Sequence, residues 1–239
     1  MNTSHQHYNN ILIIDTATEA CSAAIVTDGE VHHQFEICPQ QQSQRILPMI
    51  SDLCQRAGIN IQQIDAIGFG HGPGSFTGVR IAIGTVQGLA LGLDIPVVGV
   101  STLAAMAQQV VDEQTGSKDI LVAIDARMSE VYFGHYRCLS TESSDIELIG
   151  TEKVMSPEAA AEYSSRFPAA AYAGTGWQAY PNLHVFTAQQ MPSVKLPNAC
   201  FMVPETLLKL ADKQVDSAET AVPVYLRDTV TWQKLPGRE

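Results

Sequence analysis

Apolar and polar positions near the N-terminus follow the pattern of a β-meander. Residues 11–37 contain an apolar run that ends at Asp15, an alternating run, an Asp28-Gly29 turn and a third run. A period of two, interrupted by an Asp-Gly turn, is typical of hairpins. We therefore predict three antiparallel strands in this segment.

Helical and extended patterns alternate in the next stretch. Strand, helix and strand in this order are typical of parallel βαβ units. Pro48 must lie in the first turn of its helix or at a kink. The predicted elements are a helix that Ser43 caps and Gly58 ends, a strand over 64–69, a helix over 76–93 and a strand over 96–100.

The second half has a weaker pattern. Ser156-Pro157 is typical of a helix start. We also predict a short strand over 170–173 and a helix over 204–210, and we assign no element to residues 177–203.

An internal repeat organises the chain. The run ILIID ends at Asp15, and 110 residues later LVAID ends at Asp125; an alternating strand follows each. Any two hairpins that begin with an aspartate can look alike, so this alternative stays open. We favour a duplicated α/β fold, because 239 residues divide into two halves of small-domain size. The predicted halves are 1–105, with 220–239 as a candidate completion, and 106–219.

Charge argues against a nucleic-acid-binding surface. The chain has 14 Lys and Arg against 25 Asp and Glu, a net charge of −11. No lysine precedes Lys118. Neutralising a phosphate backbone takes several bases, which the first half lacks.

The cysteines and the N-terminus predict a cytoplasmic protein. The five cysteines are widely spaced, with no C-x-x-C pair, which is typical of reduced, buried thiols. The N-terminus lacks the pattern of a signal peptide. Residues 81–100 approach membrane length but hold polar residues, proline and glycine, so we expect a helix and a buried strand.

A glycine loop lies between a predicted strand and the helix over 76–93. Such a loop can bind phosphate through free amides and the helix dipole. A Walker loop is excluded because it needs a lysine, and the dinucleotide fingerprint fails where Thr77 replaces its third glycine. The loop residues are Gly72, Gly74, Ser75, Thr77 and Gly78.

Three glycines recur at four-residue spacing on the helix that follows. Gly84, Gly88 and Gly92 would share one face, which lets another backbone come close. That backbone belongs either to a partner helix or to the chain's own sheet. Arg80, one turn into the helix, is either a surface arginine or a partner for an acid or anion.

We find no constellation for nucleophilic or metal-dependent chemistry. The histidines and cysteines do not assemble into a catalytic pair or a ligand set, so we predict neither catalytic residues nor a metal site. Asp15 and Asp125 remain as a symmetric pair. They can face each other across a cleft and hold a metal, or they can cap their loops.

Motifs over nearly the whole chain resemble the bacterial TsaB (YeaZ) family. They are GHGPGSFTGVRIAIGTVQGLALG, IDTATEACSAAIV, AIDARMSEVYFGHY, GTGWQAY and PVYLRDTVTWQKLPGRE. The resemblance implies the duplicated actin-like, sugar-kinase-like fold. It also implies an accessory subunit in forming N6-threonylcarbamoyladenosine at position 37 of tRNAs that read codons beginning with A.

The related catalytic family, TsaD, has an H-x-x-x-H helix that holds its metal. In this chain the two metal positions fall on Thr102 and Met106, which are poor ligands for a hard or borderline cation. The resemblance therefore implies a subunit that needs no cofactor of its own, with ATP or ADP and magnesium only at an interface of the complex.

The family resemblance also implies partners. They are TsaD, the ATPase TsaE and a second copy of the chain; tRNA is reached mainly through the complex, and no membrane is involved. Gln42 stands where many relatives have histidine. The implied interface in the first half consists of Arg45, Ile46, Met49, Arg80, Gly84, Gly88 and Leu89.

Two other functions stay open on the sequence. The chain can be an ATPase with Asp15 and Asp125 around magnesium and Gly174 near the base. It can also be a peptidase, although no nucleophile or metal ligands assemble for one.

Overall fold

The computed structural model describes residues 8–113, 116–139, 145–183 and 194–227. Its two five-stranded sheets come from the two halves of the chain. The first sheet has the order β3-β2-β1-β4-β5. Its elements are β1 (Asn10–Asp15), β2 (Ala20–Thr27), β3 (Glu30–Ile37), α1 (Gln42–Arg56), the 3-10 turn η1 (Ile61–Gln63), β4 (Ala66–Gly72), α2 (Phe76–Leu93) and β5 (Val97–Ser101).

The second sheet has the order β10-β6-β7-β8, with β9 paired to β7. The chain enters it through α3 (Thr102–Asp112) and continues with β6 (Asp119–Arg127), β7 (Glu130–Cys138), β8 (Ile146–Leu148), β9 (Lys153–Met155), α4 (Pro157–Ser164), β10 (Ala171–Ala173), α5 (Gly176–Ala179) and η2 (Pro181–Leu183). It then returns to the first sheet with η4 (Ala199–Met202) and α6 (Val203–Ala211).

The two sheets share one topology, which confirms the duplication. β1 pairs antiparallel with β2 and parallel with β4. β6 likewise pairs antiparallel with β7 and parallel with β10. Two unrelated hairpins would not both carry the same parallel neighbour on the other side. The architecture is the duplicated actin-like arrangement of two mixed sheets with flanking helices.

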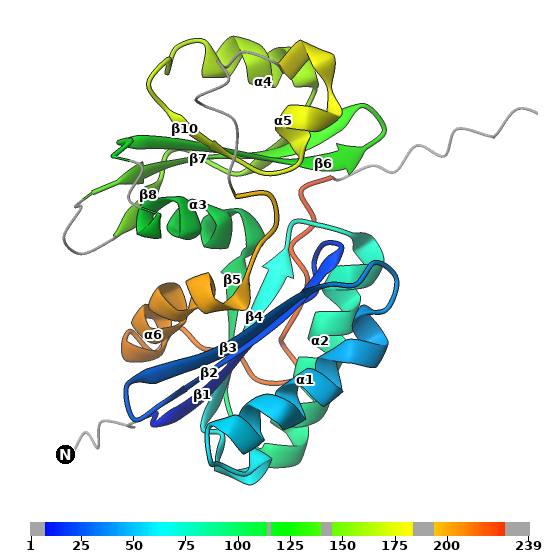
Figure 1. Cartoon of the computed structure of the whole chain (residues 1–239), viewed down its shortest axis with the longest axis vertical. Coiled ribbons are helices and arrows are strands. Elements are labelled where there is room, and N and C mark those ends of the chain that lie inside the picture. The colour runs from blue at the N-terminus through cyan, green and yellow to red at the C-terminus, as the bar shows by residue number, and fades with distance from the viewer. Residues whose placement is uncertain (1–7, 114–115, 140–144, 184–193, 228–239) are drawn as a thin grey trace, which may run out of the picture.

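Helices and sheets alternate in layers (Figure 1). α1 and α2 cover one face of the first sheet, with Phe69 and Leu53 in the core between them. The other face packs on α6, η4 and α3, and α3 also packs on the second sheet. α4 and α5 cover the far side of that sheet around Trp177. Each of these helices thus packs its buried apolar positions against a sheet.

The start of α1 differs from the prediction. The helix begins at Gln42 with Gln41 as its N-cap, and no side chain caps it, so the assignment of Ser43 as the cap is wrong. Gln42 is buried and its Nε2 donates to the carbonyl of Thr18, 2.7 Å away. This tertiary contact places the helix start, and Pro48 lies inside the helix.

The boundaries of two strands also differ from the prediction. β4 begins two residues later than predicted and extends to Gly72, while β5 runs over Val97–Ser101. Of the unassigned region 177–203, residues 184–193 lie outside the described residues. The five cysteines are free thiols, and all but Cys200 are buried, as predicted.

Polar contacts join the two halves at two places that bear on the site. The Ser101 hydroxyl and the Tyr136 hydroxyl both donate to Glu152. At the end of the described chain, Arg227 contacts the β6–β7 turn through Glu130 and the carbonyl of Ala126. The segment Ala221–Arg227 therefore runs from the first core to the second sheet, and we call it the C-terminal strap.

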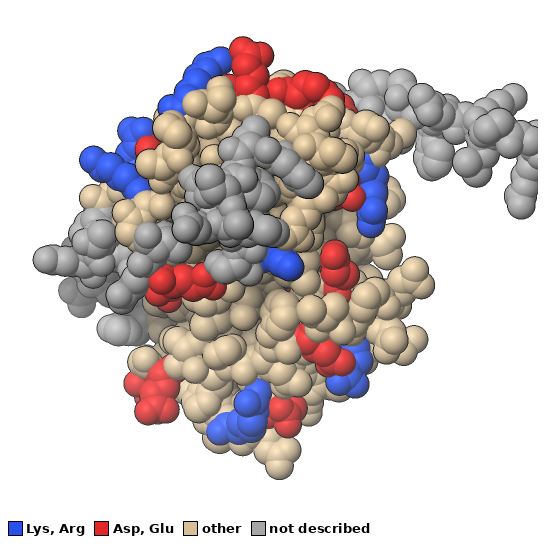
Figure 2. Space-filling model, turned by 45° about the horizontal axis from the view of Figure 1, so that its top comes forward, with Lys and Arg blue, Asp and Glu red and all other residues tan. Residues whose placement is uncertain are grey.

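Charged side chains are scattered over the face that Figure 2 shows. On the face in Figure 2, basic and acidic side chains are mixed and form no broad basic patch. Among the described helices, α2 alone is long and apolar enough to match a membrane span by length and composition. Only 33% of that α2 window is buried, so much of an apolar helix faces outward.

Candidate functional site

Asp15 ends β1 at the carboxyl edge of the first sheet, and it is fully buried. Oδ1 accepts a hydrogen bond from the Ala17 amide at 3.2 Å, while Oδ2 has no hydrogen-bond partner among the described residues. Loss of solvent raises the pKa of this carboxyl to about 7. Gly70 runs beside the carboxylate, and the Met202 side chain lies against the same position. Asp15 therefore presents no exposed oxygen with which to hold a cation.

The glycine loop packs against the chain's own β1–β2 loop. A Cβ on Gly74 would lie 2.3 Å from the Ala17 carbonyl oxygen, and one on Gly78 would lie 2.1 Å from that of Thr16. The Ser75 amide donates to Ala17 at 2.7 Å, and the Ser75 hydroxyl caps α2 by accepting from Gly78. The close backbone approach that the glycines predict is thus made to this loop.

The remaining loop residues have different surroundings. Gly72 has a φ of +102°, in the region that favours glycine, and the strap carbonyl of Val224 lies close to it. Thr77 is exposed on the first turn of α2.

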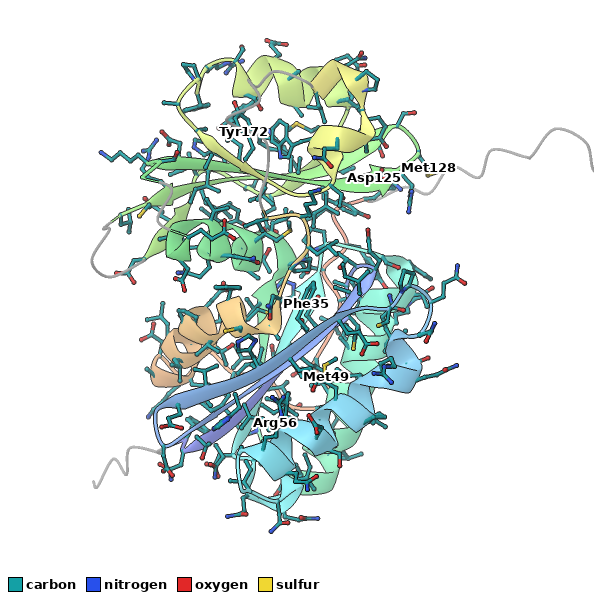
Figure 3. The ribbon with its side chains drawn as sticks, viewed as in Figure 1. Phe35, Met49, Arg56, Asp125, Met128 and Tyr172 are labelled. Carbon is teal, nitrogen blue, oxygen red and sulfur yellow. The ribbon has the colours of Figure 1, made fainter. Side chains whose placement is uncertain are left out.

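Asp125 has a different environment from its counterpart Asp15. Its side chain is 18% exposed and forms an ion pair with Arg127 at 3.0 Å. It also accepts a hydrogen bond from the Tyr180 hydroxyl at 2.7 Å. Asp125 lies beside Met128 at the end of β6 (Figure 3). Within the described ranges, no hydrogen bond or ion pair joins Asp125 to Asp15.

Gly174 packs against β6. A Cβ there would lie 2.0 Å from the carbonyl oxygen of Ala123, and its φ is +104°. Close packing against β6 explains why this position is a glycine, and the predicted role beside a nucleotide base is not needed to explain it.

The two positions that hold metal in the catalytic family lie in the interior. Thr102 and Met106 are fully buried on α3, and Met106 belongs to the apolar core against the second sheet. No group of three or more His, Cys, Asp or Glu residues in the described part of the chain is arranged to hold a metal ion. These residues do not fit the metal of that family.

A groove of about 480 Å³ lies between α1 and α2 on the outer face of the first half. It brings together five of the predicted interface residues. Its walls are mainly apolar, and Leu47 beside it is 54% exposed. The lining residues are Ser43, Ile46, Leu47, Arg80, Ile81, Gly84, Thr85, Gly88 and Leu89.

The remaining two predicted interface residues do not line the groove. Arg45 is exposed on α1 and forms an ion pair with Glu36 at 2.7 Å. Met49 is 3% exposed and points into the core beneath α1 (Figure 3).

The glycine face, Gly84, Gly88 and Gly92, faces outward. A Cβ at any of the three would meet no described residue within 4 Å, whereas a Cβ on Gly70, Gly74 or Gly78 would have a neighbouring atom within 2.3 Å. The sheet-facing side of α2 is formed by other residues, among them Val79 and Val86. The glycines therefore do not pack α2 on its own sheet. Of the two alternatives that the sequence left open, contact with the chain's own sheet is excluded.

Arg80 lies one turn before Gly84 on the same face of α2. Its guanidinium carbon is 3.4 Å from the centroid of the Phe76 ring. The ring of Tyr225, from the C-terminal strap, stacks on Phe76 with centroids 5.9 Å apart. Sequence reasoning missed this stack, because the pairing joins residues about 150 positions apart and has no local signal.

Comparisons with known proteins show the family of this chain. Residues 26–232 match the model of the family described as TsaD: tRNA N6-adenosine threonylcarbamoyltransferase. The tRNA threonylcarbamoyladenosine biosynthesis protein TsaB of Escherichia coli (strain K12) is 45% identical over 232 residues, covering 96% of this chain and 99% of that protein. The chain belongs to the TsaB family. The protein of the same name from Haemophilus influenzae is 42% identical, with 96% and 98% coverage.

A solved TsaB-family structure has the same fold. The structure of YeaZ from Pseudomonas aeruginosa superposes with a TM-score of 0.78 at 41% identity, covering 91% of this chain and all of that one. The family resemblance seen in the sequence motifs and the predicted fold are both confirmed. Thr102 and Met106, which replace the metal ligands on α3, and the buried Asp15 are thus found in a member of the TsaB family.

Proposed function

We propose that this chain is a non-catalytic scaffold that forms a heterodimer with TsaD. With the ATPase TsaE it supports formation of N6-threonylcarbamoyladenosine on tRNAs that read codons beginning with A. The outward glycine face beside the α1–α2 groove carries this proposal, because it offers close backbone approach to a helix that the described residues do not supply. The names of the TsaB relatives, which refer to threonylcarbamoyladenosine biosynthesis, supply the pathway.

The exposed side of α2 supports a protein partner. Glycine costs roughly 1 kcal/mol in a helix interior relative to alanine, and packing against the described residues gives the three exposed glycines nothing that offsets this cost. Close contact with a second helix would offset that cost. The same surface serves a second copy of the chain, so the homodimer and the heterodimer compete for it.

The surroundings of Asp15 support an accessory role. A fully buried carboxyl with no exposed oxygen is unsuited to hold magnesium, and Thr102 and Met106 are unsuited to hold the TsaD metal. The scaffold needs no cofactor of its own. ATP or ADP with magnesium binds at an interface of the complex, and tRNA contacts are made mainly by the partners, since the first half carries three arginines and no lysine.

Co-elution with purified TsaD from the same genome tests the heterodimer. The chain should shift TsaD to a larger species on a sizing column, and Gly88→Arg should abolish the shift while its thermal unfolding stays cooperative. Ala169→Arg adds the same side chain to an exposed site in the second half and should leave the shift intact. An unchanged shift with Gly88→Arg would refute the interface.

Calorimetry tests the ATPase alternative. The isolated chain should show no micromolar binding of magnesium–ATP and no turnover. Binding with turnover that Asp15→Asn abolishes would refute the scaffold proposal.

A further inference from the structure

The exposed stripe of α2 changes character along its length. Residues four positions apart are neighbours on a helix surface, and each step turns by about 40°, so the row Phe76, Arg80, Gly84, Gly88 and Gly92 winds slowly around α2. The stripe thus begins with an aromatic ring and a cation and continues as bare backbone. The cation stands at one end of the groove that Gly84 and Gly88 line.

Arg80 is held in place but not neutralised. Its guanidinium lies on the Phe76 ring at 3.4 Å, and the Tyr225 ring centroid is 5.9 Å from the guanidinium carbon. Stacking orients the plane and leaves the N–H edges free. Among residues 8–113, 116–139, 145–183 and 194–227, no hydrogen bond or ion pair uses those edges. Other exposed arginines of the first half, Arg45 and Arg56, form ion pairs with Glu36 and Asp52.

We propose that Arg80 receives a carboxylate from the partner's helix, and that this ion pair fixes the position of that helix along the groove. The proposal rests on the proposed function and specifies its contact. A fixed, unpaired guanidinium at the rim of an apolar groove is suited to bidentate carboxylate binding. Apolar packing on glycine tolerates sliding, so the ion pair supplies the register.

The groove favours an acidic protein helix over RNA. Ile46, Leu47, Ile81 and Leu89 form much of its wall, and among the described residues Arg80 is the one Lys or Arg that lines it. A nucleic acid backbone needs several cations at once. An apolar helix that carries a single acidic residue needs only one cation. The groove offers this combination, because Arg80 lies beside an apolar wall.

Helix geometry specifies where the acid must lie. Arg80 and Gly88 are eight residues apart, about 12 Å along the axis at about 1.5 Å per residue. A partner helix that runs along the stripe must therefore place a small residue against Gly88 and an Asp or Glu seven or eight residues away. This spacing identifies the acid in the partner's sequence.

Phe76 is a positioning residue in this proposal. Its ring contacts Arg80 and does not contact the partner's carboxylate. Its loss should weaken binding only while Arg80 is present, so Phe76→Leu and Arg80→Met should not add in a double-mutant cycle.

The test measures the affinity of the folded full chain for purified TsaD at low and high salt. Arg80→Met, which keeps the apolar stem, should weaken binding about thirtyfold or more and flatten the salt dependence. Arg80→Glu should weaken it further, and an Asp→Arg or Glu→Arg change at the predicted partner position should restore binding. Arg56→Met removes an exposed arginine that does not line the groove and should leave the affinity within about twofold.

The outcomes separate the two proposals. If Gly88→Arg abolishes binding while the Arg80 variants bind like wild type, the interface stands and the ion pair is refuted. If Gly88→Arg also binds normally, the proposed function falls with it. If the Arg80 variants lose retention of tRNA but keep their affinity for TsaD, the guanidinium binds phosphate and the carboxylate proposal is wrong.

Discussion

Gly70 on β4 passes so close to Asp15 on β1 that a Cβ on the glycine would lie 1.9 Å from the carboxylate Oδ2. The two strands pair in parallel, and their ends enclose the carboxyl with Met202. Asp15 is therefore enclosed by the chain itself and does not face an open cleft.

This packing predicts that Gly70→Ala is destabilising. The added methyl must displace backbone or a buried carboxyl, at a cost of about 2–3 kcal/mol in the free energy of unfolding. Urea unfolding measures the change. Gly84→Ala is the matched control, because a Cβ there meets open space, and it should stabilise the monomer by about 0.5–1 kcal/mol. A larger loss with Gly84→Ala than with Gly70→Ala would contradict the structure.

The raised pKa of Asp15 predicts a dependence of stability on pH. Burial raises the pKa from 3.8 to about 7, so the folded state keeps this proton to a higher pH than the unfolded state does. The contribution of Asp15 is therefore most favourable below pH 3.8 and is lost as the pH rises toward 7.

Asp15→Asn removes this titration and keeps the Oδ1 acceptor for the Ala17 amide. Its free energy of unfolding should equal that of wild type near about pH 4 and exceed it by up to about 4 kcal/mol near about pH 8. Urea unfolding at both pH values measures the difference. A constant difference between the two proteins across this range would show that Asp15 does not titrate as a buried acid.

Much of the fold follows from local pattern. The meander, the α2 boundaries at Phe76 and Leu93 and the matched runs ending at Asp15 and Asp125 are all visible in the sequence, because periodicity and turn residues are local. The start of α1 is not, since a contact of Gln42 with Thr18 determines it.

The candidate site was only partly predictable. The spacing of Gly84 and Gly88 marks a face for close approach, but the sequence cannot show which way that face points. The close approach of Gly70 to Asp15 joins residues 55 positions apart, and the Phe76–Tyr225 stack is even less local. Such contacts leave no periodic signal in the chain.

The contacts of Arg227 predict that the C-terminal strap stabilises the fold. Its guanidinium donates to Glu130 and to the carbonyls of Ala126 and Arg127, in a turn where Arg127 and Met128 have positive φ. Arg227→Ala leaves these acceptors without their donor and should cost about 1–3 kcal/mol. Thermal unfolding measures it, with Arg166→Ala as a near-neutral control, because Arg166 is an exposed arginine in the turn after α4 that pairs only with exposed Glu162 among the ion pairs of the described residues. Equal losses for the two variants would show that the strap contact contributes little.

Reconstituted tRNA modification is the most direct test of the scaffold function. TsaD, TsaE, the threonylcarbamoyl donor and a tRNA that reads codons beginning with A are combined with the wild-type chain, with Gly88→Arg or with no added chain. We predict rapid formation of N6-threonylcarbamoyladenosine with wild type, and a loss with Gly88→Arg as large as the loss without the chain. Modification at the full rate without the chain would contradict the function, and full activity of Gly88→Arg would contradict the interface.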